Sequence, residues 1–311
     1  MSKLPNKEFR QLVCLMREDK DFYEHEEKRP IHWPEYNLAH IQEAKETLQF
    51  IRDEIDKAET LCIKGKAGKP LTNPKSLAKA VLVCEALGLT ERNAEGWISI
   101  LGPFLGIREH LDDRTIGDAY EKIEVLHLLK QIFGKTKNSD GILSGDGTGL
   151  ETSRKQNYES SKKAGHHMTS IVDSREIVQA FDIYEQECKA MHNLINLVYG
   201  NSIRLDAGFN DRGLVKKIAE SGMIPYVFPK KNNNLNGSVA WKSMYTDLFL
   251  DVMTWLTEYH QRSHSESFHS SFKTKYGIIT KRRLCSILSQ VTARIILHNR
   301  RRIDYFKRVN G

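Results

Sequence analysis

The sequence has few cysteines and no long apolar run. Its five cysteines are scattered over 311 residues and none of them forms a C-x-x-C pair. Neither a disulfide framework nor a zinc site is therefore indicated. The N-terminus is polar and charged, and nowhere do about 18 apolar residues follow one another. We expect no membrane segment and a soluble, cytoplasmic protein.

A nucleotide-binding loop and internal repeats are also missing. The basic, Gly-rich stretch at residues 64–70 reads K-G-K-A-G-K-P. It is not a P-loop, because no Ser or Thr follows a G-x4-G-K frame, so we expect no nucleotide cofactor. The stretch fits a simple linker, and it also fits a connector that runs along a phosphate backbone.

The charge that is present is mostly positive. Lys and Arg number 47 against 40 Asp and Glu, giving a formal net charge of +7 and a pI near 9.0. This balance favours a polyanionic partner such as nucleic acid, although many basic proteins bind none. The length leaves room for about two domains and a sizeable core.

The first 135 residues have the pattern of helices. Apolar residues recur every three or four positions over 38–58, and Pro, Thr, Asp and Gly signals delimit helices at 75–87, 91–101 and 116–133. Residues 1–37 are polar and interrupted by proline, with a short apolar patch at 12–16. Short helices separated by Gly turns are compatible with a helix-turn-helix DNA-reading unit. A helical bundle without DNA contacts would have the same pattern.

From residue 136 the pattern changes to alternating strands and helices. We predict strands at 142–147, 166–173, 177–184, 203–209 and 224–229, and helices at 185–199, 212–220, 243–258 and 285–302. Three consecutive strands, a crossover helix and further strand and helix units predict an α/β sheet with helices on both faces.

Three acidic residues emerge from these elements in order. Asp146 and Asp206 each stand at a predicted strand end, and Glu266 lies on a later helix. In α/β sheets, chemistry gathers where strands end. Each acid also has a structural interpretation, since D-G is a common turn pair and Asp206 could cap a helix. Three acids in this order favour a shared site.

The stretch from Tyr259 to Lys273 adds a second pattern. On one continuous helix Tyr259, Arg262, Glu266 and Lys273 fall within an arc of about 60°. A carboxylate on this face could hold a divalent metal while its neighbours grip phosphate oxygens. A solvated helix face with an Arg–Glu ion pair is the alternative. His269 could support Glu266 from behind, although we expect it at the surface.

These residues carry a resemblance to a known family. Residues 259–273 fit the signature Y-x2-R-x3-E-x6-K, and D-G-T around Asp146 and D-x-G-F around Asp206 look like two aspartate motifs. Over residues 140–305 the chain resembles the DDE transposases of prokaryotic insertion sequences, in the branch with the Y-R-E-K signature. Some relatives carry a β-rich insertion between the second aspartate and the glutamate, for which sixty residues leave little room.

The resemblance implies a fold, a metal site and a division of the chain. It implies an RNase H-like domain at 136–311 with the two aspartates on adjacent central strands, preceded by a helical end-binding or dimerisation region at 1–135. Asp146, Asp206 and Glu266 would be the catalytic residues and would hold two Mg2+ or Mn2+ ions. Tyr259, Arg262 and Lys273 would bind DNA phosphates near the scissile bond.

The implied function is DNA transposition, with cleavage at insertion-sequence ends and strand transfer into target DNA. The partners would be double-stranded DNA, as terminal inverted repeats and as target, and a second copy of the chain bound with it to the DNA ends. Its place would be the nucleoid. Two alternatives stay open. One is an RNase H-like nuclease or resolvase without strand transfer, and the other is a catalytically silent DNA-binding remnant of a mobile element.

Overall fold

The chain divides into two compact units. A computed structural model describes residues 6–18, 30–61, 72–155, 163–183 and 185–310. The first unit comprises Met1–Pro30, Asn138–Leu150 and His166–Ser271, and the second comprises Ile31–Lys137, Glu151–Gly165 and Phe272–Gly311. Within the described residues, no helix is both long and apolar enough to cross a membrane. The division into functional domains at residue 135 stays a prediction.

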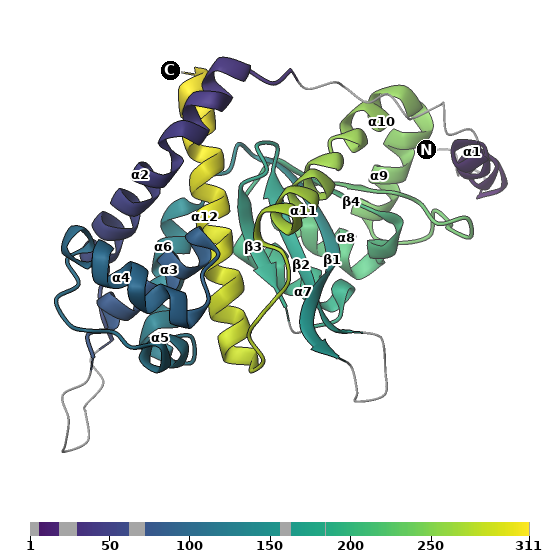
Figure 1. The fold of residues 1–311 in the computed structure, drawn as a ribbon. Helices are drawn as coiled ribbons and strands as arrows, with labels where there is room; N and C mark the ends of the chain where they lie inside the picture. Colours follow the sequence, from purple (N-terminus) through teal and green to yellow (C-terminus); the bar gives the residue numbers. More distant parts are fainter. Residues whose placement is uncertain (1–5, 19–29, 62–71, 156–162, 184, 311) are drawn as a thin grey trace. The chain divides into compact units, whose positions relative to one another are not determined.

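A five-stranded mixed sheet with the order β3-β2-β1-β4-β5 organises the fold (Figure 1). Strand β1 pairs parallel with β4, β4 pairs parallel with β5, and β2 pairs antiparallel with β3. Helices lie on both sides of it, which confirms the predicted α/β class and agrees with an RNase H-like fold. The strands are β1 (Ile142–Lys155), β2 (Lys163–Asp173), β3 (Val178–Asp182), β4 (Ser202–Leu205) and β5 (Ile224–Val227).

Helices cover the strands of the first unit, and side-chain caps set where several of them begin. Asp211 accepts from Leu214 N at the start of α8, Ser238 from Trp241 N at α9, and Asp251 from Thr254 N at α10. Helices α8, α9 and α10 pack on β5. The elements are α7 (Glu187–Leu194), η2 (Ile195–Leu197), η3 (Ala207–Phe209), α8 (Arg212–Glu220), α9 (Val239–Leu250), α10 (Val252–His260) and α11 (Ser263–Tyr276).

The chain's first helix is a feature that the sequence reading missed. Residues 6–18 form α1 (Asn6–Glu18), where only a short apolar patch was expected. Phe9, Val13 and Met16 recur every three or four residues, and all three are buried in the core of the first unit. The Phe9 ring packs 5.1 Å from that of Tyr245. The helix is stabilised by packing against core residues far away in the sequence, so its own charged composition gave little indication of it.

Several predicted boundaries are wrong for identifiable reasons. The helix predicted at 243–258 is two helices, because Asp251 has extended backbone angles and caps α10. The strand predicted at 203–209 ends at Leu205, because Asp206 turns the chain into η3. Strand β1 continues to Lys155, well beyond the predicted end at 147. The predicted helix 185–199 is confined to α7 and the short η2.

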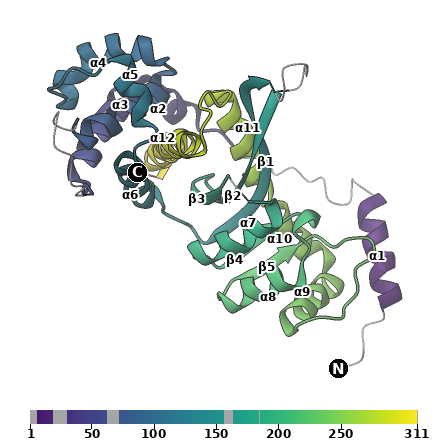
Figure 2. The ribbon, with the colours of Figure 1, turned by 90° about the horizontal axis from the view of Figure 1, so that it is seen from below.

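The described part of the second unit is helical apart from its share of β1 and β2. Figure 2 looks along α12 and shows α2, α3 and α6 around it, and each of these packs against α12. Two predictions here are wrong. The helix predicted to end at 101 continues to Leu105 with Pro103 inside it, and 116–133 is two helices. The elements are α2 (Trp33–Lys57), α3 (Pro74–Leu87), α4 (Glu91–Leu105), α5 (Asp113–Ala119), α6 (Ile123–Thr136) and α12 (Leu284–Asn310). The basic connector at 64–70 lies outside the described residues.

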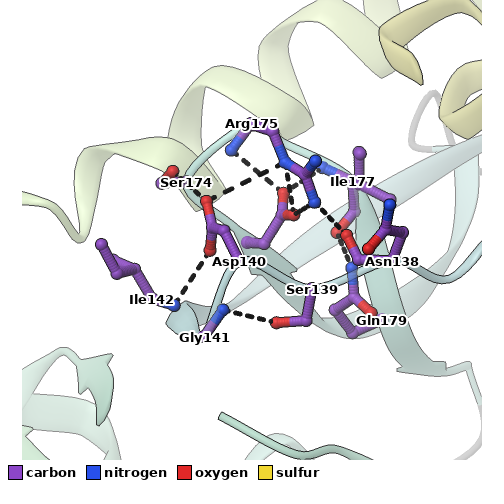
Figure 3. Close-up of polar contacts among 10 residues, drawn as sticks. Asn138, Ser139, Asp140, Gly141, Ile142, Ser174, Arg175, Ile177 and Gln179 are labelled. Atoms are coloured by element: carbon purple, nitrogen blue, oxygen red, sulfur yellow. Dashed lines mark hydrogen bonds and ion pairs between the residues drawn. The ribbon is translucent and has the colours of Figure 1, made fainter. Parts of the chain in front are cut away.

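A polar cluster fixes the turn between β2 and β3 to the segment that enters β1 (Figure 3). Asp173 is fully buried and accepts from Arg175 Nη2 at 2.7 Å, from Arg175 Nε at 3.1 Å and from Ile177 N at 2.9 Å. Arg175 also bonds the carbonyl of Asn138, and Ser174 bonds the carboxylate of Asp140. We call this group the Asp173 cluster.

Candidate active site

Two of the predicted acids lie on neighbouring strands, level with the carboxyl end of β4. Strands β1 and β4 are parallel, with Gly145 opposite Leu205. The next residues are Asp146 on β1 and Asp206 just beyond β4, on strands about 4.8 Å apart. Asp206 turns the chain and accepts from Gly208 N at 2.7 Å. The register therefore brings two carboxylates from distant parts of the sequence to neighbouring positions.

The glycines around Asp146 are closely packed by neighbouring side chains. A Cβ atom on Gly145 would lie 2.7 Å from Met191 Cε. One on Gly147 would lie 2.1 Å from Glu187 Oε1 and 2.5 Å from His167 Nε2. Side chains from α7 and β2 thus press against the backbone on both sides of Asp146. A larger residue at either position would have to displace these side chains.

The segment from Tyr259 to Lys273 is not one continuous helix, so the predicted common face is wrong. Helix α10 ends at His260 and α11 begins at Ser263. Arg262 lies in the turn between them, and its N–H donates to Tyr259 O at 2.9 Å.

Arg262 nevertheless links two of the acids. Its Nη2 lies 2.5 Å from Glu266 Oε1, and its Nη1 lies 3.9 Å from Asp146 Oδ2. The guanidinium is mostly buried, and burial alone lowers its pKa. Tyr259, Glu266 and Asp146 outweigh that effect, so the Arg262 pKa is raised above its ordinary value. Arg262 is therefore a firmly charged group between two carboxylates.

Tyr259 lies beneath this arginine in an aromatic stack. Its ring is parallel to that of Trp255 at 5.4 Å and packs against Phe228 at 5.1 Å. Only 8% of the residue is exposed, and the Arg262 guanidinium lies over the ring, 5.9 Å from its centroid. Tyr259 supports Arg262 from below, and a direct contact with a phosphate stays a prediction.

Lys273 differs from the other signature residues in its exposure and in the unit to which it belongs. It lies exposed in the last turn of α11, within the second unit. Its proposed grip on a DNA phosphate stays a prediction.

The residues around Asp146 strongly alter its titration. Burial raises the pKa of the Asp146 carboxyl to about 6, and the nearby charges of Asp206 and Glu266 add to the rise. A hydrogen bond from Gly147 N at 2.8 Å and the Arg262 charge oppose the rise without cancelling it. A buried carboxylate facing two others is a place where a cation would be stabilised.

His269 belongs to this site, contrary to the expected surface position. It is 6% exposed, its Nδ1 lies 3.9 Å from Asp146 Oδ2, and its Nε2 lies 2.9 Å from Ser170 Oγ. Residues three apart on a helix share a face, so its spacing from Glu266 could have revealed this position.

Arg204 was missed altogether by sequence reasoning. It lies two residues before Asp206 in β4 and is 1% exposed. Its Nε donates to the Glu258 carbonyl at 2.9 Å, and its Nη2 bonds the Glu258 carboxylate. The pair ties the strand that carries Asp206 to the end of α10, immediately before Tyr259. An arginine between two apolar residues of a predicted strand, Ile203 and Leu205, was the available signal.

The three acids are chemically suitable ligands for a divalent metal. Carboxylate oxygens are the ligands that Mg2+ and Mn2+ prefer. Burial, and to a smaller extent the charges of Asp206 and Glu266, raise the pKa of Asp146, so its ionised form is disfavoured until a cation neutralises it. As the side chains stand, the described residues include no group of three His, Cys, Asp or Glu positioned to hold an ion. Glu266 is instead paired with Arg262.

Comparison with known families agrees with this geometry. The model of the transposase DDE domain family matches residues 137–299, just over half of the chain. The chain belongs to the transposase DDE domain family. Membership gives this DDE-domain chain a transposase role with DNA as substrate, and members normally use divalent metal ions. The match includes every predicted site residue. No curated protein and no solved structure matches the chain.

Proposed function

We propose that this transposase cleaves DNA at the ends of an insertion sequence and joins the freed ends to target DNA. Asp146, Asp206 and Glu266 are the catalytic acids in this proposal. The observation that carries it is the β1–β4 register, which brings Asp146 beside Asp206 while Arg262 links Asp146 to Glu266.

The chemistry needs charge more than covalent participation by the protein. Two Mg2+ or Mn2+ ions, held by the three carboxylates, would supply charge to activate the attacking oxygen and steady the leaving one. Water first attacks the scissile phosphorus at the element's end, which breaks the P–O3′ bond and leaves a 3′-OH and a 5′-phosphate. The 3′-OH then attacks a phosphorus of the target strand, forms the new ester bond and displaces the target's own 3′ oxygen as a 3′-OH. Arg262 turns from Glu266 to a phosphate near the scissile bond, since a guanidinium binds phosphate oxygens bidentately.

The remaining residues orient the strand. Tyr259 keeps the guanidinium of Arg262 in place from below, and its hydroxyl reaches a backbone phosphate. Lys273 adds a compact charge on a neighbouring phosphate. His269, held by Ser170, contacts the Asp146 carboxylate. This contact keeps Asp146 in the rotamer that directs its oxygens to the metal ions.

The larger assembly completes the proposal. Residues 136–311 act as the catalytic domain, and the helical region within 1–135 recognises the terminal inverted repeats. Two copies bind two ends, because paired ends must reach one target together. Exposed cations such as Arg108 and Arg114 around α5 suit this recognition. In the full-length chain, Arg108→Ala with Arg114→Ala should weaken binding to a terminal repeat more than binding to a scrambled sequence. Equal losses on both fragments would remove these residues from recognition.

Substitution of the acids tests the catalytic proposal. Asp146→Asn, Asp206→Asn and Glu266→Gln should each abolish Mg2+-dependent cleavage of an end fragment while binding to that fragment survives. Glu220→Gln is the matched control, because Glu220 is an exposed carboxylate on α8 paired with Lys216. Measurable cleavage by any one acid variant would remove that residue from the site.

A further inference from the structure

A polar pocket lies in the first unit, near the predicted acids in the sequence but separate from them. Its volume is about 410 Å3, and the side chains that define it include Asn210, Arg212, Lys230, Asn233, Asn234 and Trp241. We call it the Arg212 pocket. None of its lining residues belongs to the family signature or to the acids of the proposed active site.

The pocket lies beyond the carboxyl ends of β4 and β5, and Asp206 directly follows β4. Asn210 and Arg212 follow Asp206 by four and six residues, and Lys230 and Asn233 follow β5. Strands β4 and β5 are parallel, so both wall segments leave the same edge. From β1 to β5 is about 10 Å at 4.8 Å per strand, and DNA rises about 3.4 Å per nucleotide. The strand spacing corresponds to about three nucleotides, so DNA bound at the acids can extend past the pocket.

Contacts within the walls hold the polar groups in position. Arg212 Nη2 donates to Asn234 Oδ1 at 2.7 Å, and the guanidinium lies 5.6 Å from the centroid of the Trp241 ring. Trp241 Nε1 donates to the Asn234 carbonyl at 2.9 Å. Asn233 is buried, and its Nδ2 donates to the Tyr245 hydroxyl at 2.9 Å. These contacts reduce the entropy that a ligand would have to remove on binding.

The charge of the pocket favours an anion. Arg212 and Lys230 contribute two cations against one carboxylate, that of Asp211. Asp211 Oδ1 already accepts from Leu214 N at 2.7 Å and lies 3.1 Å from His192 Nε2. A guanidinium has five N–H donors, of which Asn234 takes one. Amides and cations at this density suit a phosphate better than an apolar ligand.

We propose that Arg212 and Lys230 form a second phosphate subsite, which holds the DNA backbone a few nucleotides from the scissile bond. This inference rests on the proposed function, because it takes DNA as the ligand. The subsite fixes the path of the strand leaving the acids. Its residues act on the DNA and take no part in bond breaking.

The test uses the full-length chain and an end fragment across a salt series. The slope of log K against log salt is negative for DNA binding. Arg212→Gln with Lys230→Gln should make it shallower by about 1.8, the value for two lost phosphate contacts. Lys189→Gln with Lys216→Gln is the control of equal charge, since each lysine is ion-paired with a glutamate four residues away in the sequence. An equal fall in slope for both pairs would overturn the proposal, because the effect would then be one of general charge.

A second arm alters the DNA and compares the unaltered chain with the Arg212/Lys230 variant. Neutral methylphosphonate linkages are placed one at a time on either side of the scissile bond. The unaltered chain should lose affinity at one or two positions within a few nucleotides of that bond, and the Arg212/Lys230 variant should lose none there. Persistent sensitivity of the variant at those positions contradicts the subsite. If the unaltered chain binds no end fragment at all, the proposed function fails instead.

Discussion

Two buried carboxylates of the first unit have very different surroundings. Asp173, the last residue of β2, accepts four hydrogen bonds from Arg175 and Ile177, the partners labelled in Figure 3. Asp146, on β1, accepts one from Gly147 N, and its other oxygen lies 3.9 Å from both Arg262 and His269. Burial raises the pKa of both groups, and like charge adds to the rise at both, from Asp140 at Asp173 and from Asp206 and Glu266 at Asp146. The two carboxylates therefore differ chiefly in the number of hydrogen bonds that they accept.

The difference separates a carboxylate used for structure from one kept for a ligand. A buried charge is tolerated when hydrogen bonds and an opposite charge satisfy it, as at Asp173. Asp146 lacks that satisfaction and faces Asp206 and Glu266. An unbalanced carboxylate in this position costs stability until a cation arrives, which is the expected cost of a metal site.

The largest effect is expected at the Asp173 cluster. Arg175→Ala leaves Asp173 buried without its cation, so the free energy of unfolding should fall by about 3 kcal/mol near neutral pH. Chemical denaturation measures it. The loss should shrink at low pH, where Asp173 can take up a proton. Unchanged stability would mean that backbone hydrogen bonds alone satisfy Asp173.

The opposite sign is expected at Asp146. Its pKa of about 6 in the folded chain exceeds the ordinary 3.8, so the folded state binds the proton more tightly. This contribution to stability is fully present below about pH 4 and is lost as pH rises through about 6. Without metal, Asp146→Asn should therefore stabilise the chain above about pH 7, by at most about 3 kcal/mol.

A pH series of denaturation curves checks this sign. Asp146→Asn should flatten the pH dependence of stability between about pH 4 and 6. Glu220→Gln, which alters an exposed ion pair, should leave that dependence in place. A destabilised Asp146→Asn at neutral pH would show that Arg262 and Gly147 already balance the carboxylate.

Much of this arrangement could be predicted from the sequence. Apolar residues that recur every two positions located the strands, and those that recur every three or four positions located most helices. Helix α8 was predicted at its observed bounds. The acids were found by their places after strands. Their adjacency depends on the pairing of β1 with β4, a contact 60 residues apart that only the family resemblance implied.

The remaining features depend on tertiary contacts. Helix α1 is stabilised by a core more than 100 residues away in sequence, so its own composition hides it. Arg204 and Glu258 pair across 54 residues. The turn at Arg262 was missed because an unbroken helical period continues through residues 259–273, although the backbone leaves the helix there.

Arg262 sharpens the contrast between the two carboxylates, because it pairs with Glu266 and approaches Asp146. Arg262→Gln should free Glu266 and lower the Mg2+ concentration for half-maximal stabilisation about two- to fivefold, the worth of a partly exposed ion pair. DNA affinity should fall at the same time. A higher Mg2+ requirement would mean that Arg262 organises the acids for metal rather than competing with it.

The smallest effect is expected at Lys273, an exposed residue in the last turn of α11. Lys273→Ala should reduce the salt slope of end binding by about 0.9, as for one phosphate contact. The Mg2+ requirement for cleavage should stay unchanged, since no ligand is lost. Lys216→Ala serves as the control. An intact salt slope with a raised Mg2+ requirement would assign Lys273 to the metal site.

The central claim is that Asp146, Asp206 and Glu266 carry unbalanced charge which divalent ions neutralise. The most direct test is to follow the free energy of unfolding without DNA as Mg2+ or Mn2+ is added. The unaltered chain should gain stability with ion concentration, about 2.7 kcal/mol at a hundredfold excess over the dissociation constant. Asp146→Asn and Glu266→Gln should gain little, and Glu220→Gln should respond like the unaltered chain. The same gain in the acid variants, or none in an unaltered chain that cleaves DNA, would contradict the claim.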